Sequence, residues 1–254
     1  MDFQDYVSVD CVIFGYDFER LKVLLLERVM LDQATHQVIF ADKILPGSHV
    51  LNNDNIEAAA RRVLVEFTGI EDISLHQFKT FGDLDRLNRQ ERDILWLKNI
   101  HQDPNQRVLT VGFYSLIDAN KYKLSVTKQQ SHPEMFKRNP AWYDIDAIPE
   151  EMAYDHKQIL FEALAYLREG VKYNPLVFEL LPEKFTLGLL QKIYETILNT
   201  TFDKRNFRRK LLKMPFIVPL EEKQQKVAHK PAQLYRFDWK LYQQVKRNNH
   251  DIML

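Results

Sequence analysis

Cysteine is nearly absent from this sequence, and long apolar runs are absent altogether. Cys11 is the only cysteine among the 254 residues, which excludes an intramolecular disulfide framework and is typical of proteins of the reducing cytoplasm. No run of about eighteen apolar residues occurs, so we expect no transmembrane helix and no membrane partner. The acidic start MDFQDYVSVD lacks the basic and apolar regions of a signal peptide. Together these absences predict a cytoplasmic protein.

The motifs of several enzyme classes are missing as well. The histidines form no H-E-x-x-H pair, and the chain has neither a G-x-x-x-x-G-K phosphate loop nor a G-x-S-x-G nucleophile elbow. Cys11 stands within an apolar alternation, where a core residue is expected rather than a nucleophile. These patterns give no candidate for zinc-protease, P-loop or serine-hydrolase chemistry.

The net charge of zero conceals two parts of opposite charge. Residues 201–250 carry 13 Lys or Arg and 4 Asp or Glu, a local charge of +9. The remainder carries 22 basic and 31 acidic residues, a charge of −9. Concentrated positive charge predicts that the C-terminal part meets a polyanion. A solvated basic face is the alternative, and charge alone does not choose between them.

Apolar periodicity predicts strands around one helix in the first 150 residues. Strands are predicted at YVSVDCVIFGY, where Val7, Val9, Cys11 and Ile13 share one face of a half-buried strand, and at KVLLLERV, QVIFADKI, HQFKTFGD and RVLTVGFYSLI. A helix is predicted over residues 56–67, with Gly69 as its C-cap. Strands surrounding a helix predict an α/β (α+β) domain over residues 1–150.

A linker helix is predicted over residues 151–172. Its helical face is apolar and ends at Gly170; the residues of this face are Ile159, Leu160, Ala163, Leu164 and Leu167. The predicted elements change here from strands to helices, which predicts a second domain over residues 173–254.

The second domain has the pattern of a winged helix-turn-helix. A first helix presents Leu187, Leu190, Tyr194 and Ile197, and a second helix begins after Asp203, a credible N-cap. Phe207, Leu211 and Met214 form the core face of the second helix, and cations spread over its opposite side. The hairpin that follows, with Lys223, Lys226 and Lys230, is predicted to be the wing.

This arrangement predicts contacts with double-stranded DNA. The candidate contact residues are Lys204, Arg205, Asn206, Arg208, Arg209, Lys213, Lys226 and Lys230. A helical packing or oligomerisation domain with a basic face is the alternative, and the hairpin favours DNA.

Residues 48–70 resemble the Nudix box, G-x5-E-x7-R-E-U-x-E-E-x-G-U, in which U is a bulky aliphatic residue. With Gly69 as the anchor, the positions that match are Arg62, Leu64, Glu66 and Ile70. The positions that depart are Ser48 for Gly, Asp54 for the first Glu, and Val63 and Phe67 for two further Glu. Nudix hydrolases cut nucleoside diphosphates with Mg²⁺, which requires several oxygen ligands. We therefore assign no catalytic residue, no metal ligand and no cofactor, and expect Arg62 and Glu66 to stabilise the loop and helix.

Most of the chain is similar to the Nudix-related transcriptional regulators. The similarity lies in TFGDLDR, DPNQRVLTVGFYSL and AWYDID in the first half, and in FELLPEKFTLGLLQKIYE, DKRNFRRKLL and KPAQLYRF in the second. It implies a Nudix-like sensor domain joined to a winged helix-turn-helix, a homodimer, and operator binding controlled by a small molecule, with repression the common outcome. An active hydrolase with an accessory domain and a scaffold for RNA or protein are the competing functions. Residues 87–102 interrupt a stretch that is nearly continuous in the family.

The effector is predicted from the eroded Nudix box. Branches of the family respond to ADP-ribose and related NAD metabolites, or to sugars such as arabinose. Loss of the metal site removes the charge neutralisation of a pyrophosphate, so L-arabinose is expected first and ADP-ribose is the alternative. A sugar pocket needs polar groups that bind hydroxyls and an aromatic face. The effector-binding candidates are therefore Glu27, Asp42, Lys43 and Trp96. Packing of Trp96 against the core or a dimer partner is an equal alternative.

Overall fold

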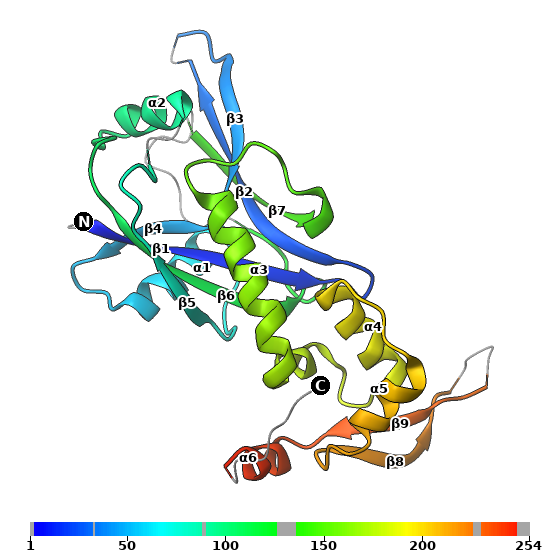
Figure 1. Ribbon diagram of the computed structural model, residues 1–254. Helices are drawn as coiled ribbons and strands as arrows, with labels where there is room; N and C mark the ends of the chain where they lie inside the picture. The colour runs from blue at the N-terminus through cyan, green and yellow to red at the C-terminus, as the bar shows by residue number, and fades with distance from the viewer. Residues whose placement is uncertain (1–2, 33, 88–89, 126–135, 226–229, 248–254) are drawn as a thin grey trace. The chain divides into compact units, whose positions relative to one another are not determined.

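The computed structural model describes residues 3–32, 34–87, 90–125, 136–225 and 230–247. It divides into two compact units, Met1–Tyr166 and Leu167–Leu254 (Figure 1). The division falls inside the predicted linker helix 151–172. No helix among the described residues combines the length and the apolar character needed to cross a bilayer.

The first unit is built on a seven-stranded sheet with the order β3-β2-β1-β6-β5, in which β4 also pairs with β1 and β7 with β2. Its strands are β1 Phe3–Tyr16, β2 Leu21–Leu31, β3 Val38–Ile44, β4 Gly47–Leu51, β5 His76–Phe81, β6 Leu109–Asp118 and β7 Phe136–Asp144. The β1–β6 pair is parallel and the other pairs are antiparallel. Its helices are α1 Ile56–Thr68, α2 Glu91–Asn99 and η1 Ile145–Ala147.

Strand β1 lies in the middle of this sheet and is buried on both faces. Val9, Cys11 and Ile13 pack in one core cluster, with Val7 against its edge, so their predicted shared face is confirmed. Phe14, which points to the other face, is also fully buried. The expectation of a half-buried strand was wrong, because α1 and the first turns of α3 lie on opposite sides of the sheet (Figure 1).

Helix α1 begins and ends as its sequence predicts. The Asn55 side chain accepts a hydrogen bond from the Ala58 amide at 2.7 Å, which satisfies a free donor of the first turn. Gly69 caps the other end in the left-handed region with φ 70°, where its amide donates to the Val65 carbonyl.

Helix α3, His156–Tyr173, runs through the division between the two units. All five residues of its predicted apolar face are buried. Gly170 does not end the helix, because burial of Val171 offsets the weak helix propensity of glycine. The helix instead ends before Pro175, which begins the next element.

The second unit contains a helix-turn-helix followed by a β-hairpin. After the end of α3, its elements are η2 Pro175–Leu180, α4 Leu187–Leu198, α5 Lys204–Leu211, β8 Ile217–Lys223, β9 Gln233–Phe237 and α6 Trp239–Arg247. The predicted core residues of α4 are all buried. An isolated bridge joins Phe185 to Tyr235 beside the hairpin. The winged helix-turn-helix prediction is confirmed, whereas α6 was not predicted.

Helix α5 has the predicted cap and core face. The Asp203 side chain accepts from the Asn206 amide at 2.8 Å. Phe207 and Leu211 are buried, and Phe207 packs on the rings of Tyr194 and Phe202. Met214 lies beyond the end of the helix and is half-buried.

Candidate effector cavity and DNA-binding face

The first unit holds a cavity of about 160 Å³, which we call the α2 cavity. Its walls come from β1, β2, the end of β3, β4, α2, the segments before α2 and β6, and the residues that lead into and begin α3. Apolar side chains of α2 and its C-terminal end form one side: Trp96, Leu97 and Ile100. The polar and charged residues of the wall include Asp10, Arg28, His49, Arg86 and His156. It therefore offers both an aromatic surface and charged groups to a ligand.

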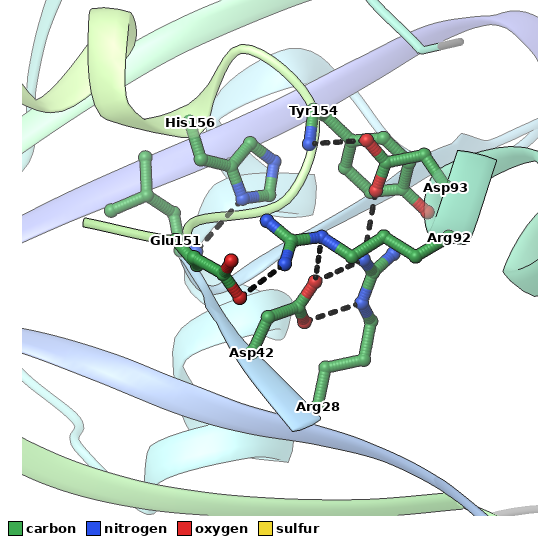
Figure 2. Close-up of polar contacts among 8 residues, drawn as sticks. Arg28, Asp42, Arg92, Asp93, Glu151, Tyr154 and His156 are labelled. Carbon is green, nitrogen blue, oxygen red and sulfur yellow. Dashed lines mark hydrogen bonds and ion pairs between the residues drawn. The ribbon is translucent and has the colours of Figure 1, made fainter. Parts of the chain in front are cut away.

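Arg28 is a fully buried cation beside this cavity. Its Nε donates to Asp42 Oδ1 at 2.7 Å, and its Nη2 donates to Asp42 Oδ2 and to Asp93 Oδ1, the latter at 2.8 Å (Figure 2). Burial opposes the charged form, but the hydrogen bonds to the two carboxylates outweigh it and raise the pKa of Arg28. Burial also raises the pKa of Asp93, although Arg28 partly offsets this. These ion pairs allow Arg28 to remain charged in the protein interior, where an unpaired charge would be energetically costly.

Three aromatic rings surround the Arg28 guanidinium. Its Cζ lies 5.2 Å from the ring centre of Phe40, 5.0 Å from that of Trp96 and 4.9 Å from that of Tyr154. These are cation–π distances. Among the described residues, Nη1 of Arg28 is a buried donor without a hydrogen-bond partner.

Arg86 is a second buried arginine of the wall. It forms two hydrogen bonds of 2.9 Å with the Asp155 carboxylate and one of 3.3 Å with Asp10 Oδ2. Burial raises the pKa of Asp10, and Arg86 offsets this only in part. Gly47 leaves room for the Asp10 carboxylate, because a Cβ at this position would collide with Oδ1.

His156 is neutral at the first position of α3. Its Nδ1 accepts a hydrogen bond from the Leu45 amide at 3.0 Å (Figure 2), and its Nε2 lies 3.5 Å from Asp10 Oδ1. Burial lowers its pKa to about 3. An acceptor at Nδ1 places the proton on Nε2, which fixes the tautomer.

The Nudix-box helix has become part of the core. Val63 and Phe67 pack in the main core cluster at positions where the Nudix pattern has carboxylates. Arg62 donates to Asp54 at 2.7 Å and to the His49 carbonyl at 3.0 Å, and pairs with Glu66 at 3.5 Å. The expected role of Arg62 and Glu66 in holding loop and helix together is supported by these contacts.

A Nudix-type Mg²⁺ does not fit this helix. Two of its ligand positions are apolar, and the surviving carboxylate of Glu66 is paired with Arg62. Over the part of the chain that the structure describes, no group of three or more His, Cys, Asp or Glu side chains is arranged to hold a metal ion.

The predicted effector residues are not brought together. Asp42 and Trp96 lie beside Arg28, but Lys43 pairs with Glu27 at 2.7 Å on the other face of the sheet, where its Nζ lies 5.5 Å from the Tyr143 ring. Neighbouring residues of a strand point to opposite faces, which separates Asp42 from Lys43. Of the four candidates only Trp96 lines the α2 cavity.

Arg28, Arg86 and His156 were not predicted. For Arg28 a signal existed, because a lone arginine in the apolar strand LKVLLLERVML is rarely buried without a partner. No comparable signal marks Arg86 or His156, which are placed by contacts with residues distant in sequence.

The predicted DNA-binding residues cluster on the exposed side of α5. Lys204, Arg205, Asn206, Arg208 and Arg209 are all exposed, and a surface hollow is lined by most of these cations. Arg209 Nη2 donates to Asn206 Oδ1 at 2.9 Å, which orders both side chains. Lys213, just beyond the helix, and Lys230, before β9, are exposed. Lys226 lies outside the described residues.

An α+β unit joined to a winged helix with an exposed basic helix defines a two-part DNA-binding regulator. Residues 177–237 match the NrtR DNA-binding winged helix domain family. The ADPR responsive transcriptional repressor NtrR of Acinetobacter baylyi is 33% identical over 235 residues, which cover 91% of this chain and 81% of that protein. The chain therefore belongs to the NrtR family of DNA-binding transcriptional repressors.

Solved structures share the fold of the whole chain. Shewanella oneidensis NrtR in complex with a 27mer DNA is similar with a TM-score of 0.65 and 22% identity, over 93% of this chain and 95% of that one. A MutT/nudix family protein from Enterococcus faecalis has a TM-score of 0.59 and 20% identity, over 92% of this chain and 86% of that one. These similarities confirm the predicted fold class, a Nudix-like mixed α/β domain with a C-terminal winged helix.

The buried position of His156 predicts its behaviour on titration. When the pH is lowered from about 7.5 to about 5, the imidazole should stay neutral with its proton on Nε2, because burial disfavours the charged form. Histidine-selective ¹⁵N NMR measures this, with a His156→Asn variant to assign the signal. In urea-unfolded protein the same histidine should titrate near about 6.5. Protonation of His156 in the folded protein above about pH 6 would contradict the structure described above.

Proposed function

We propose that this protein is a repressor that binds operator DNA through its winged helix unit and releases it when ADP-ribose, or a closely related nucleotide, binds in the α2 cavity. The observation that carries the proposal is the 33% identity to an ADPR responsive repressor over 91% of the chain, which includes both units. The homodimer expected from the sequence stays a prediction.

The basic side of α5 supports the DNA-binding half of the proposal. The N-terminal residues of a recognition helix contact base edges in the major groove, while neighbouring cations meet phosphates. Lys204, Arg205 and Arg208 are exposed on such a helix, and Asp203 and Phe207 fix its start and its orientation.

Replacement of Arg208 by Ala should weaken operator binding without unfolding the protein, because this side chain is exposed. A base-contacting arginine should cost about 1–3 kcal/mol and relax specificity at one position, whereas a phosphate contact should reduce the salt slope by about 1. Fluorescence anisotropy at several salt concentrations distinguishes the two.

The matched control for this variant is Arg107→Ala, which removes an exposed cation from the first unit. It should leave the affinity for the operator unchanged. If both Arg208→Ala and Arg209→Ala bind the operator with wild-type affinity, α5 does not contact the operator.

The relative favours ADP-ribose over L-arabinose, and the α2 cavity offers donor groups and an aromatic surface that suit it. The expectation of a neutral sugar rested on the loss of Mg²⁺, which would leave a pyrophosphate without a counter-charge. The guanidinium groups of Arg28 and Arg86 lie at the cavity wall and offer N–H donors of the kind that bind phosphate oxygens, although both groups are already paired with carboxylates. Trp96 adds an aromatic surface of the kind on which a base or ribose packs. The cavity encloses only about 160 Å³, so part of a nucleotide ligand would extend beyond it.

Titration of ADP-ribose into a preformed protein–operator complex should dissociate it, whereas L-arabinose should not. A ligand shifts the equilibrium between bound and free operator only if it binds the DNA-free protein more tightly than the protein–operator complex. We expect ADP-ribose to have this preference and L-arabinose to lack it. Anisotropy of labelled operator follows the release, and the melting temperature of the free protein should rise with ADP-ribose, since about 100 Kd of ligand adds about 2.7 kcal/mol. Release by arabinose alone would restore the sugar as the effector.

We also propose that the first unit is catalytically silent. Val63 and Phe67 offer no oxygen to a cation, and Glu66 is held by Arg62. ADP-ribose incubated with the purified protein and Mg²⁺ or Mn²⁺ should therefore be recovered intact by chromatography. Turnover clearly above that of a protein-free control would overturn this proposal and leave the DNA-binding proposal untouched.

A further inference from the structure

The geometry points to α2 as the element that carries the effector signal from the α2 cavity to the start of α3. We infer that Asp93 on α2 is the positioning residue of this connection, because it holds the chain at Tyr154, just before α3. The inference rests on the proposed function and concerns the regulation of the same site.

Helix α2 contacts both the cavity and the chain that leads into α3. Trp96 and Leu97 form part of the cavity wall. On the same helix, Asp93 is fully buried and does not line the cavity. Its Oδ2 accepts the Tyr154 amide at 3.2 Å, while its Oδ1 accepts from Arg28 (Figure 2). Asp93 thus connects Trp96, one turn along the same helix, with Tyr154, which itself lines the cavity.

The backbone at Tyr154 is held in an unfavourable conformation. Its φ is 53°, in the left-handed region, which bulky residues rarely adopt. Such a conformation persists only where surrounding contacts determine it. The carboxylate of Asp93 supplies one of these contacts, and the packing of the Tyr154 ring on the Arg28 guanidinium supplies another. Release of Asp93 would remove one of the contacts that hold this residue in its conformation.

The residues on either side of Tyr154 are also anchored to the cavity wall. The Ala153 amide donates to the Lys43 carbonyl at 2.9 Å, Arg86 holds the Asp155 carboxylate, and His156 accepts from the Leu45 amide. The start of α3 is thus fixed by groups that line the α2 cavity or lie directly behind its wall. Helix α3 itself runs from His156 to Tyr173 and so spans the division of the chain at Tyr166.

The test compares wild-type protein, Asp93→Asn and a matched control variant. Glu162→Gln removes another ion pair of α3, the one with Lys79 at 2.8 Å, which lies outside the cavity wall. For each protein the operator affinity is measured with and without saturating ADP-ribose, and the ratio is the coupling factor. The same factor must appear when ADP-ribose affinity is measured with and without operator.

We expect Asp93→Asn to bind operator alone within about threefold of wild type, but to lose at least about fivefold of the coupling factor at saturating ADP-ribose, since typical couplings are about 5–150-fold. Glu162→Gln should keep the wild-type factor. A wild-type factor in Asp93→Asn, or an equal loss in both variants, would overturn the role of Asp93. A wild-type protein that binds operator but ignores ADP-ribose would overturn the proposed effector instead.

Hydrogen exchange on the wild-type protein tests the inference without any substitution. Adding ADP-ribose should change the protection of the amides of residues 152–156, whereas peptides from β5 should not respond. Unchanged exchange at residues 152–156 while the operator is released would overturn the inference, and it would do so even if Asp93→Asn failed to fold.

Discussion

The buried ion cluster of Arg28, Asp42 and Asp93 is the constraint on which the first unit depends. A charge taken out of water costs several kcal/mol, and removal of one partner from a buried pair costs about 3–5 kcal/mol. Arg28 comes from β2, Asp42 from β3 and Asp93 from α2, so the cluster is satisfied only when α2 lies against the sheet. Helix α2 is therefore an integral part of the fold, and the packing of Trp96 on Arg28 follows from the same requirement.

Helix α1 has apolar side chains at two positions where the Nudix pattern has carboxylates. Helix α1 keeps the Nudix position of Arg62, but uses it to tie the helix to its preceding loop. Apolar side chains at positions 63 and 67 turn the former ligand face into core. The guanidinium groups at the cavity wall are held by carboxylates, so they provide fixed hydrogen-bond donors within neutralised ion pairs.

The opposite charges of the two parts of the chain have different physical meanings. In the first unit many acidic residues are internal partners, as Asp10, Asp42, Asp93 and Asp155 show by their burial. In the second unit the cations of α5 face solvent and contribute nothing to the core. Exposed positive charge is available to a polyanion, whereas buried pairs determine shape. A neutral chain can in this way contain both a charged interface and a charged interior.

The sequence by itself determined those features that depend on neighbours along the chain. Periodicity identified the faces of β1, α3 and α4, and local capping chemistry at Asn55, Gly69 and Asp203 set the ends of α1 and the start of α5. The exposure of the α5 cations followed from the same helical geometry. Only the tertiary structure decided which distant groups meet. Arg28 and Asp93 are 65 positions apart, and nothing local announces their pairing. Asp42 and Lys43 point to opposite faces because side-chain direction alternates along a strand, but the packing of α2 on Arg28 and Asp42 decided which of the two faces holds the cavity.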